Sequence, residues 1–481
     1  MSFKKQFLSG TFWTSINQFS LTFLNFGISV VLARLITPEE FGTIALILVF
    51  SGFATILIDS GLSSAVVQFK EFNDEQLSTI FWCNLALGTV VTGLFMIMAK
   101  PIATFYNDPS ISTYTIVLSF IFTLSSLSLV QSSLLSRNFQ FKKLTWISLI
   151  STVLSGLLAI ALAVSNYEIW SLIWQRLAYT LVNLILLWFY STWRPTFSFD
   201  WNILKKAWGF SSNLLYLSSF NYWTKNTDNL LIGKFIGAEA LGYYNRAYML
   251  MKLPSNLVNT IITKVAFPIF SKYKDDLNII RNSFLNISYV LFLVSIPFSI
   301  VLSIYSFEIV IAIFGDNWYE SGGLLKILAL AIPFSIILSL NGPVYQSQEK
   351  TKLLFTTHIY AEIFAILLVI GSVFISIYAI AWAVLIYTSL AYLYITYFVL
   401  KVLKIAVIQY LNTMKNVFLS CGIAWLFHYL VLDDYLHRFD KLTSLLFLVI
   451  SVFTSLILFF GLSVLLNFNQ LKMSLKILKA K

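Results

Sequence analysis

Long apolar stretches recur along the whole chain, and they constrain its fold more than any other feature. A helix needs about 20 apolar residues to cross the hydrocarbon layer of a bilayer, because it rises only about 1.5 Å per residue. Stretches of that kind predict fourteen membrane-spanning helices, at 11–33, 41–59, 77–99, 112–134, 144–164, 169–190, 209–236, 240–262, 283–305, 323–341, 354–376, 378–400, 414–432 and 442–466. The predicted fold class is therefore an all-α polytopic membrane protein.

The composition excludes a soluble protein. Of the 481 residues, 58% are hydrophobic and only 11% are charged, whereas soluble domains carry about 25% charged residues. Such a chain has too few charged side chains to cover a surface exposed to water. Both cysteines, Cys83 and Cys421, fall inside predicted spans, so they indicate no disulfide framework.

The net charge of +11 would suit a nucleic-acid partner, but its distribution along the chain argues against one. With the N-terminus inside the cell, 22 of the 32 Lys and Arg residues fall in cytoplasmic segments and only 5 in outer loops. This asymmetry follows the positive-inside rule, and it fits an even number of spans with both termini cytoplasmic. The charge thus orients the protein in the membrane, and we expect no nucleic-acid site.

One short phrase occurs twice in the chain. The first copy is LARLITPEEFGTIAL (32–46) and the second is LIGKFIGAEALGYYN (231–245). At an offset of 200 residues Gly42 aligns with Gly242, and we expect both glycines to permit a close approach of the following helix. Because six spans lie between the copies, both enter the membrane in the same direction. The sequence therefore predicts a parallel repeat of two six-helix halves.

The same offset aligns two polar stripes. Each stripe recurs at helical spacing on one face of the first span of its half. The members are Gln18, Thr22, Asn25 and Ser29 in the first half and Ser218, Tyr222, Lys225 and Asn229 in the second. Lipid cannot hydrogen-bond polar side chains, so each stripe must face protein or water. Packing between helices accounts for any single residue, whereas two matched stripes favour a shared polar cavity.

Ionisable side chains at membrane depth are costly and mark function or pairing. The candidates are Asp59, Arg176, Lys225, Asp228, Arg246, Lys252, Lys326, His358 and Glu362. Two pairs, Lys225 with Asp228 and His358 with Glu362, have the spacing to neutralise each other on one helix. Arg176 lies nearer the middle of its span. The set is cationic by count, which suits an anionic cargo such as a diphosphate.

No other pattern predicts a chemical site. The sequence has no glycine-rich phosphate loop and no arrangement typical of a catalytic triad. The three histidines are scattered, so a zinc site is not expected. We expect neither a cofactor nor a resident metal.

Two runs carry a resemblance to a known family. LARLITPEEFGTIALILVFSGFATILIDSGLSSAVVQ and NTDNLLIGKFIGAEALGYYNRAYMLMKLP resemble helical hairpins of the Wzx-type, or PST, polysaccharide transporters. These belong to the multidrug/oligosaccharidyl-lipid/polysaccharide flippase superfamily. The resemblance is most specific over 25–70 and 205–275.

The resemblance implies a flippase with two helix bundles around a central cavity. Such proteins move undecaprenyl-diphosphate-linked oligosaccharide across the bacterial inner membrane by alternating access, driven by an ion gradient. Membrane lipids and the polysaccharide polymerase and chain-length machinery are the expected partners. The residues assigned to the substrate cavity are Gln18, Asn25, Arg176, Tyr222, Lys225, Asn229 and Arg246. Those assigned to ion coupling are Asp59, Asp228, His358 and Glu362.

The predicted organisation is two halves, 1–200 and 201–400, with 401–481 as an added hairpin and basic tail. The boundary loop from Ser191 to Ala207 is predicted to be amphipathic and to lie on the inner membrane surface. Two alternatives stay open. A multidrug or other lipid exporter of the same superfamily shares the fold. A membrane glycan polymerase or ligase would need a larger outer loop than 307–322 or 432–441 provides, so we expect the protein not to be an enzyme.

Overall fold

The computed structural model of the chain describes residues 3–59, 62–68, 72–427, 457 and 461. These segments are almost entirely helical, and no strand occurs among them. The helices are α1 (Phe3–Leu35), α2 (Pro38–Asp59), α3 (Leu62–Gln68), α4 (Asp74–Tyr106), α5 (Ser110–Ser126), α6 (Leu129–Arg137), α7 (Phe141–Val164), α8 (Ile169–Tyr190), α9 (Trp201–Phe235), α10 (Ala238–Lys272), α11 (Leu277–Ile304), α12 (Ser306–Phe314), η1 (Asp316–Trp318), α13 (Tyr319–Leu328), η2 (Ala329–Ala331), α14 (Ile332–Ser347), α15 (Thr351–Val373), α16 (Ile377–Val402) and α17 (Val407–Phe427).

The helices fall where the apolar stretches predict them. Every predicted span up to 378–400 overlaps a helix, α17 covers most of 414–432, and the span at 442–466 lies outside the described residues. Within the described segments, nine helices are long and apolar enough to cross a membrane, or ten if α5 and α6, bent by 41°, form one span. The all-helical membrane fold is therefore confirmed, and the total of fourteen spans stays a prediction.

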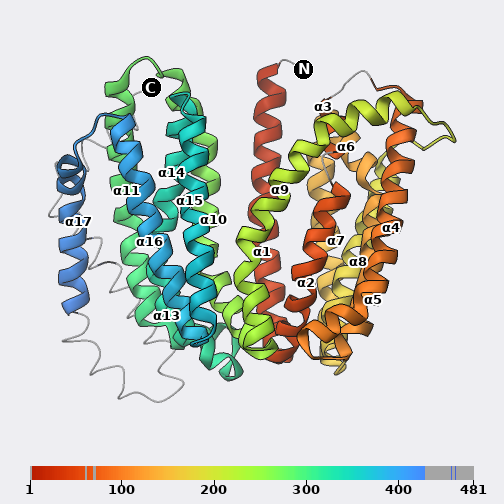
Figure 1. Cartoon of the computed structure of the whole chain (residues 1–481), viewed down its shortest axis with the longest axis horizontal. Helices are drawn as coiled ribbons and strands as arrows, with labels where there is room; N and C mark the ends of the chain where they lie inside the picture. Colours follow the sequence, from red (N-terminus) through yellow and green to blue (C-terminus); the bar gives the residue numbers. More distant parts are fainter. Residues whose placement is uncertain (1–2, 60–61, 69–71, 428–456, 458–460, 462–481) are drawn as a thin grey trace. The chain divides into compact units, whose positions relative to one another are not determined.

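The chain divides into two compact units, Met1–Gly242 and Tyr243–Lys481, and the division falls inside α10. In the first unit α7 packs against α1 and α8, α4 packs against α5, and α9 packs against α2, α3 and α4 (Figure 1). In the second unit α14 packs against α11 and α16, and α17 packs against α11. The repeat makes α9 the first helix of the second half, yet α9 packs within the first unit.

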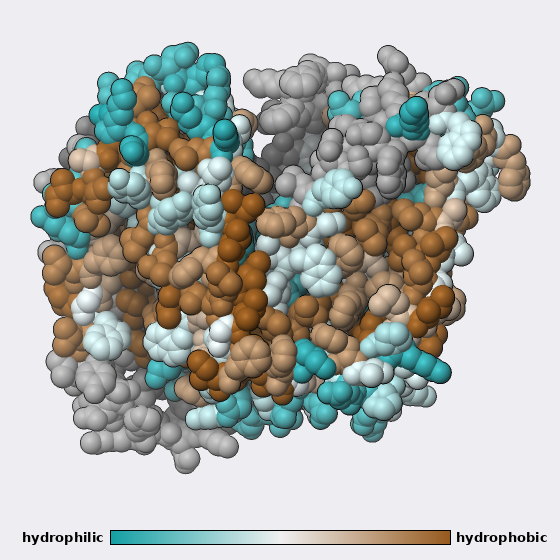
Figure 2. All heavy atoms as spheres, viewed as in Figure 1, coloured by the Kyte–Doolittle hydropathy of each residue, from teal (hydrophilic) through white to brown (hydrophobic). Residues whose placement is uncertain are grey.

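The surface of each unit shows where lipid and water lie. Hydrophobic side chains cover the middle of the helices, and hydrophilic side chains gather towards the helix ends (Figure 2). This distribution is expected when acyl chains surround the middle of a helix and water bathes its ends.

The start of α2 is fixed by a capping box. The Thr37 amide donates to Glu40 Oε2 at 3.0 Å and the Glu40 amide donates to Thr37 Oγ1 at 3.4 Å, which satisfies two amides that the helix leaves free. The other carboxylate oxygen of Glu40 accepts from the Ile169 amide at 3.1 Å, at the first residue of α8. The capping residue thereby ties the first copy of the repeated phrase to α8.

A bend separates α5 from α6, and side chains of neighbouring helices satisfy the backbone there. Asn84 Nδ2 donates to the Ser126 carbonyl at 3.2 Å, and Trp188 Nε1 donates to the Leu127 carbonyl at 2.9 Å. Such partners let a helix break at membrane depth without leaving carbonyl groups unpaired.

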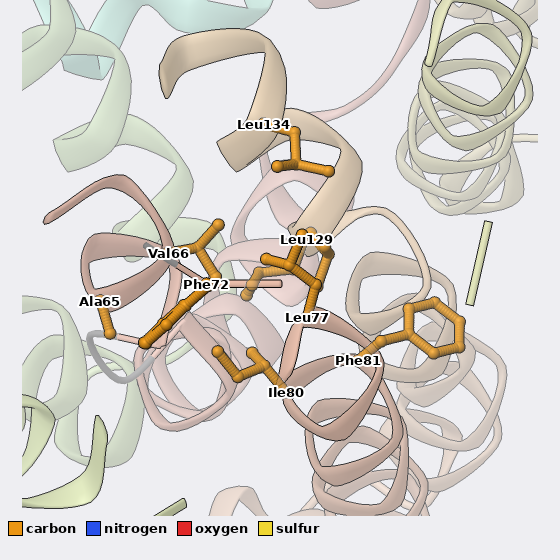
Figure 3. Packing of buried hydrophobic residues seen from close by; sticks show 9 residues of the cluster. Ala65, Val66, Phe72, Leu77, Ile80, Phe81, Leu129 and Leu134 are labelled. Atoms are coloured by element: carbon orange, nitrogen blue, oxygen red, sulfur yellow. The ribbon is translucent and has the colours of Figure 1, made fainter. Parts of the chain in front are cut away.

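One hydrophobic cluster joins α3, α4 and α6 at one end of the first unit (Figure 3). Trp188 and Trp193 pack against its edge. Its buried members are Ala65, Val66, Phe72, Leu77, Ile80, Phe81, Leu129, Val130 and Leu134.

Candidate functional site: polar helix faces of the first unit

The two copies of the repeated phrase contact each other. A Cβ atom added at Gly42 would collide with the Ala238 carbonyl, and one added at Gly242 would collide with the carbonyl of Pro38, lying 2.8 Å from its carbon. The contact is reciprocal, as it is when identical surfaces meet about a two-fold axis. The predicted role of both glycines, a close approach of the following helix, is confirmed.

Tyr222 makes a packing contact. Its hydroxyl donates to the carbonyls of Leu48 at 3.1 Å and Val49 at 2.7 Å on α2. Gly52 leaves the room for the ring, since an added Cβ there would lie 3.0 Å from Tyr222 Cζ. Tyr222, predicted to line a cavity, is thus turned towards the neighbouring helix α2.

The polar stripe of α1 is exposed on its own face. Gln18 and Asn25 are exposed, and Thr22 Oγ1 donates to the Gln18 carbonyl at 2.7 Å. Apolar exposed residues, among them Phe12 and Phe23, lie about 140° further round the helix at 3.6 residues per turn. The Gln18–Asn25 face therefore lies on a different side of α1 from its exposed aromatic residues.

Helix α9 repeats this separation. Ser218, Asn221 and Lys225 are exposed on one face. The exposed apolar residues Tyr216 and Phe220 lie about 150° away round the helix. Asn221 was not predicted, because its counterpart at the 200-residue offset is apolar Leu21. Ser218, Asn221 and Lys225 follow one another at helical spacing, and this spacing alone could have identified Asn221.

Lys225 and Asp228 on α9 have the spacing to form an ion pair, but they do not form one. Lys225 forms no ion pair within the described part of the chain. Asp228 and Asn229 are half-buried, and Asp228 Oδ1 accepts from the Asn229 amide at 2.8 Å. Asn229 Oδ1 is buried and has no hydrogen-bond partner in the part of the chain that the structure describes.

Arg176 occupies the inward face of α8. Ile173 and Leu177, its neighbours on that face, are buried. The exposed apolar residues Leu181 and Ile185 lie about 160° away round the helix. Arg176 is nevertheless exposed, and its guanidinium forms no ion pair with any other described residue. Arg176 is therefore an accessible cation on the side of α8 opposite its exposed apolar residues.

Arg246 is packed between aromatic rings of the second unit. Its guanidinium carbon lies 5.9 Å from the Phe314 ring centre and 5.6 Å from that of Trp318, and both rings are buried. Cation–π contacts of this kind stabilise a desolvated guanidinium.

The remaining predicted residues are dispersed. His358 and Glu362 are half-buried on α15 of the second unit, and His358 Nε2 is buried without a hydrogen-bond partner in the described part. Asp59 ends α2 in the first unit. The described residues contain no group of three His, Cys, Asp or Glu that could hold a metal ion.

These placements concentrate the predicted site in one unit. Eight of the eleven residues belong to the first unit. Within it, three helices carry exposed polar side chains opposite their lipid-facing sides, namely Gln18 and Asn25 on α1, Arg176 on α8, and Ser218, Asn221 and Lys225 on α9. We call these the polar faces. They provide hydrogen-bond donors and positive charge at membrane depth, which suits a polar, anionic ligand.

A labelling experiment distinguishes a polar face from a lipid-facing one on the same helix. Cysteine at Asn25 is expected to react with a membrane-impermeant maleimide in proteoliposomes, because water reaches the polar face of α1. Cysteine at Phe23, equally exposed but on the apolar face, is expected to stay unlabelled. The unmodified protein measures the background from Cys83 and Cys421. Equal labelling at both positions would show that α1 has no separate water-facing side.

Comparisons with known proteins bear on this arrangement. A family model described as "Polysaccharide biosynthesis protein" matches residues 31–323. The teichuronic acid biosynthesis protein TuaB of Bacillus subtilis (strain 168) is 32% identical over 357 residues, which cover 74% of each chain. The lipopolysaccharide biosynthesis protein WzxC of Escherichia coli (strain K12) is 28% identical over 350 residues, covering 72% of this chain and 70% of WzxC.

Among solved structures, the lipid II flippase MurJ in an inward closed conformation has a similar fold. It matches with a TM-score of 0.74 and 15% identity, covering 95% of this chain and 99% of MurJ. An inward-facing multidrug resistance MATE transporter of the MOP superfamily matches with a TM-score of 0.58 and 13% identity, covering 82% and 99% of the two chains. At these identities the likeness concerns the fold alone.

Proposed function

Because the chain belongs to the family of polysaccharide biosynthesis proteins, we propose that it is a flippase for lipid-linked saccharide. Its cargo is an undecaprenyl-diphosphate-linked oligosaccharide, the repeat unit of an O-antigen, a capsule or an exopolysaccharide. The protein moves this cargo from the cytoplasmic to the periplasmic leaflet of the bacterial inner membrane. The names of its relatives, which include a Wzx protein of lipopolysaccharide biosynthesis, support this class of cargo.

The polar faces of the first unit are the observation that carries the proposal. A diphosphate and its sugars cannot cross hydrocarbon unaided, because unpaired charge and unpaired hydroxyl groups are costly there. Amide and hydroxyl groups on α1 and α9 match sugar hydroxyls. The guanidinium of Arg176 can bind two phosphate oxygens at once. The polyprenyl chain meanwhile stays in lipid.

The mechanism we propose is alternating access coupled to an ion gradient. Asp59, Asp228, His358 and Glu362 are the proposed coupling residues, since each can exchange a proton or meet a cation at membrane depth. Fourteen spans with both termini cytoplasmic complete the proposal. Arg246, held between two aromatic rings, is proposed to support the fold around the cargo path. The polymerase and chain-length machinery would receive the cargo.

A reconstitution experiment tests the function. The purified protein in vesicles is expected to accelerate the transfer of a fluorescent undecaprenyl-diphosphate saccharide between leaflets, measured by quenching with an impermeant reductant. Vesicles containing an unrelated membrane protein give the background rate. Transport of cationic drugs without transfer of the lipid-linked saccharide would replace the proposal with a drug-exporter function.

A further inference from the structure

The segment between α8 and α9, Ser191–Asp200, is not helical and is hydrogen-bonded to α4. We call it the strap. The Thr196 amide donates to Ser78 Oγ at 3.0 Å, and Trp82 Nε1 donates to the Thr196 carbonyl at 2.9 Å. The Asp200 amide donates to Thr79 Oγ1 at 2.9 Å. These bonds fasten the linker to the first three turns of α4.

Polar and aromatic residues alternate along the strap from Thr196 to Trp201. Thr196, Ser198 and Asp200 bond to α4. The intervening aromatic residues project outward: Phe197 is 96% exposed, and Phe199 and Trp201 are 57% and 71% exposed.

Further contacts hold the strap at its start and along its length. Arg194 closes the end of α8, where Nη2 donates to the Trp188 carbonyl at 2.8 Å and Nη1 to the Ser191 carbonyl at 2.6 Å. The Phe197 ring stacks on Trp82 of α4, with centres 5.0 Å apart and planes 18° apart, and remains exposed beside that helix. Trp193 packs against the hydrophobic cluster of Figure 3.

We propose that the strap is an interfacial membrane anchor. The rings of Phe197, Phe199 and Trp201 insert at the boundary between headgroups and acyl chains, in the leaflet at the end of α8. The exposed apolar side of α8 leads directly into the strap, since it continues to exposed Phe189, two residues before Ser191. Aromatic rings are enriched at this depth of a bilayer, where apolar ring faces meet lipid.

The charge near the strap also supports a location at the lipid interface. Lys205, one turn into α9, is exposed, and a lysine at that depth attracts anionic headgroups. With the proposed orientation the leaflet is the cytoplasmic one. The anchor would hold the start of α9 at the membrane surface, independently of which cargo the protein carries.

The first test uses the unmutated protein. In vesicles that contain a phospholipid with a photoreactive diazirine next to its glycerol backbone, adducts are expected on the peptide that contains Phe197–Trp201. The exposed turn at Glu349–Lys350 serves as the water-facing control. If adducts form on the lipid-facing side of α8 and none form on the strap, the proposed anchor is wrong.

The second test uses spin labels on cysteines at Phe197 and Phe199, with Ser198 as the control in the same strap. Labels at 197 and 199 are expected to collide more often with oxygen than with a water-soluble nickel chelate, as at the interface. The label at 198 faces α4, so its collisions with both are expected to be fewer. Strap labels that meet mainly the nickel chelate would place the rings in water. Protection of 197 and 199 from both reagents would place them under another protein. Either result overturns the proposal.

Discussion

Replacing Arg176 by alanine is expected to lower the transfer of lipid-linked saccharide by about tenfold to a hundredfold, the loss expected when a charged hydrogen-bonding group is removed. The protein should still accumulate in the membrane, because the guanidinium has no ion pair among the described residues and its removal strands no buried partner. Arg176→Lys should retain part of the activity, since it keeps the charge but loses the planar fork. Transfer rates in vesicles and membrane abundance together measure the effect.

Lys100→Ala is the matched control for Arg176. Lys100 is an exposed cation near the end of α4, away from the polar faces, so its loss should leave transfer unchanged. Normal transfer by Arg176→Ala would remove this residue from the cargo path. Disappearance of the Arg176→Ala protein from the membrane would instead assign the residue a structural role.

Substituting Gly42 by alanine is expected to destabilise the protein by about 1–3 kcal/mol, the usual cost of overpacking. The added methyl group would collide with the backbone carbonyl of Ala238, and a carbonyl cannot move aside as a flexible side chain can. The starts of α2 and α10 must therefore separate. Gly242→Ala should behave alike, because the contact is reciprocal. The midpoint of thermal unfolding in detergent and the transfer rate are the measurements.

Gly27→Ala, on α1, is the control for both glycine variants. No atom lies within 4 Å of a Cβ added there, so the variant should be neutral or slightly stabilised by the better helix propensity of alanine. Gly42→Ala with the same unfolding midpoint as the unmodified protein would contradict the close approach of the two phrases.

Several features followed from the sequence because they depend on local pattern. The helices match the apolar stretches, since a bilayer requires about 20 apolar residues per crossing whatever the rest of the chain does. The repeat marked Gly42 and Gly242 as sites of close approach, whereas the contact between the two copies came from the structure. The family was likewise recognisable from two short runs.

The candidate site was predicted only in part. Gln18, Asn25, Arg176 and Lys225 are exposed on the faces that the polar stripes and charges indicated. Tyr222 was assigned to the cavity by the same spacing, but its hydroxyl bonds to α2. Spacing identifies the side of a helix, and it cannot tell whether a neighbouring helix covers that side.

The sequence by itself determined that the chain is helical, membrane-spanning and a member of its family, because bilayer thickness and helical periodicity act on contiguous residues. Only the tertiary structure decided which polar residues stay accessible and which become packing contacts. It also placed α9 in the first unit and turned the rings of the strap outward. These outcomes depend on contacts between residues more than a hundred positions apart, such as Thr196 with Ser78, and no local pattern encodes such a partner.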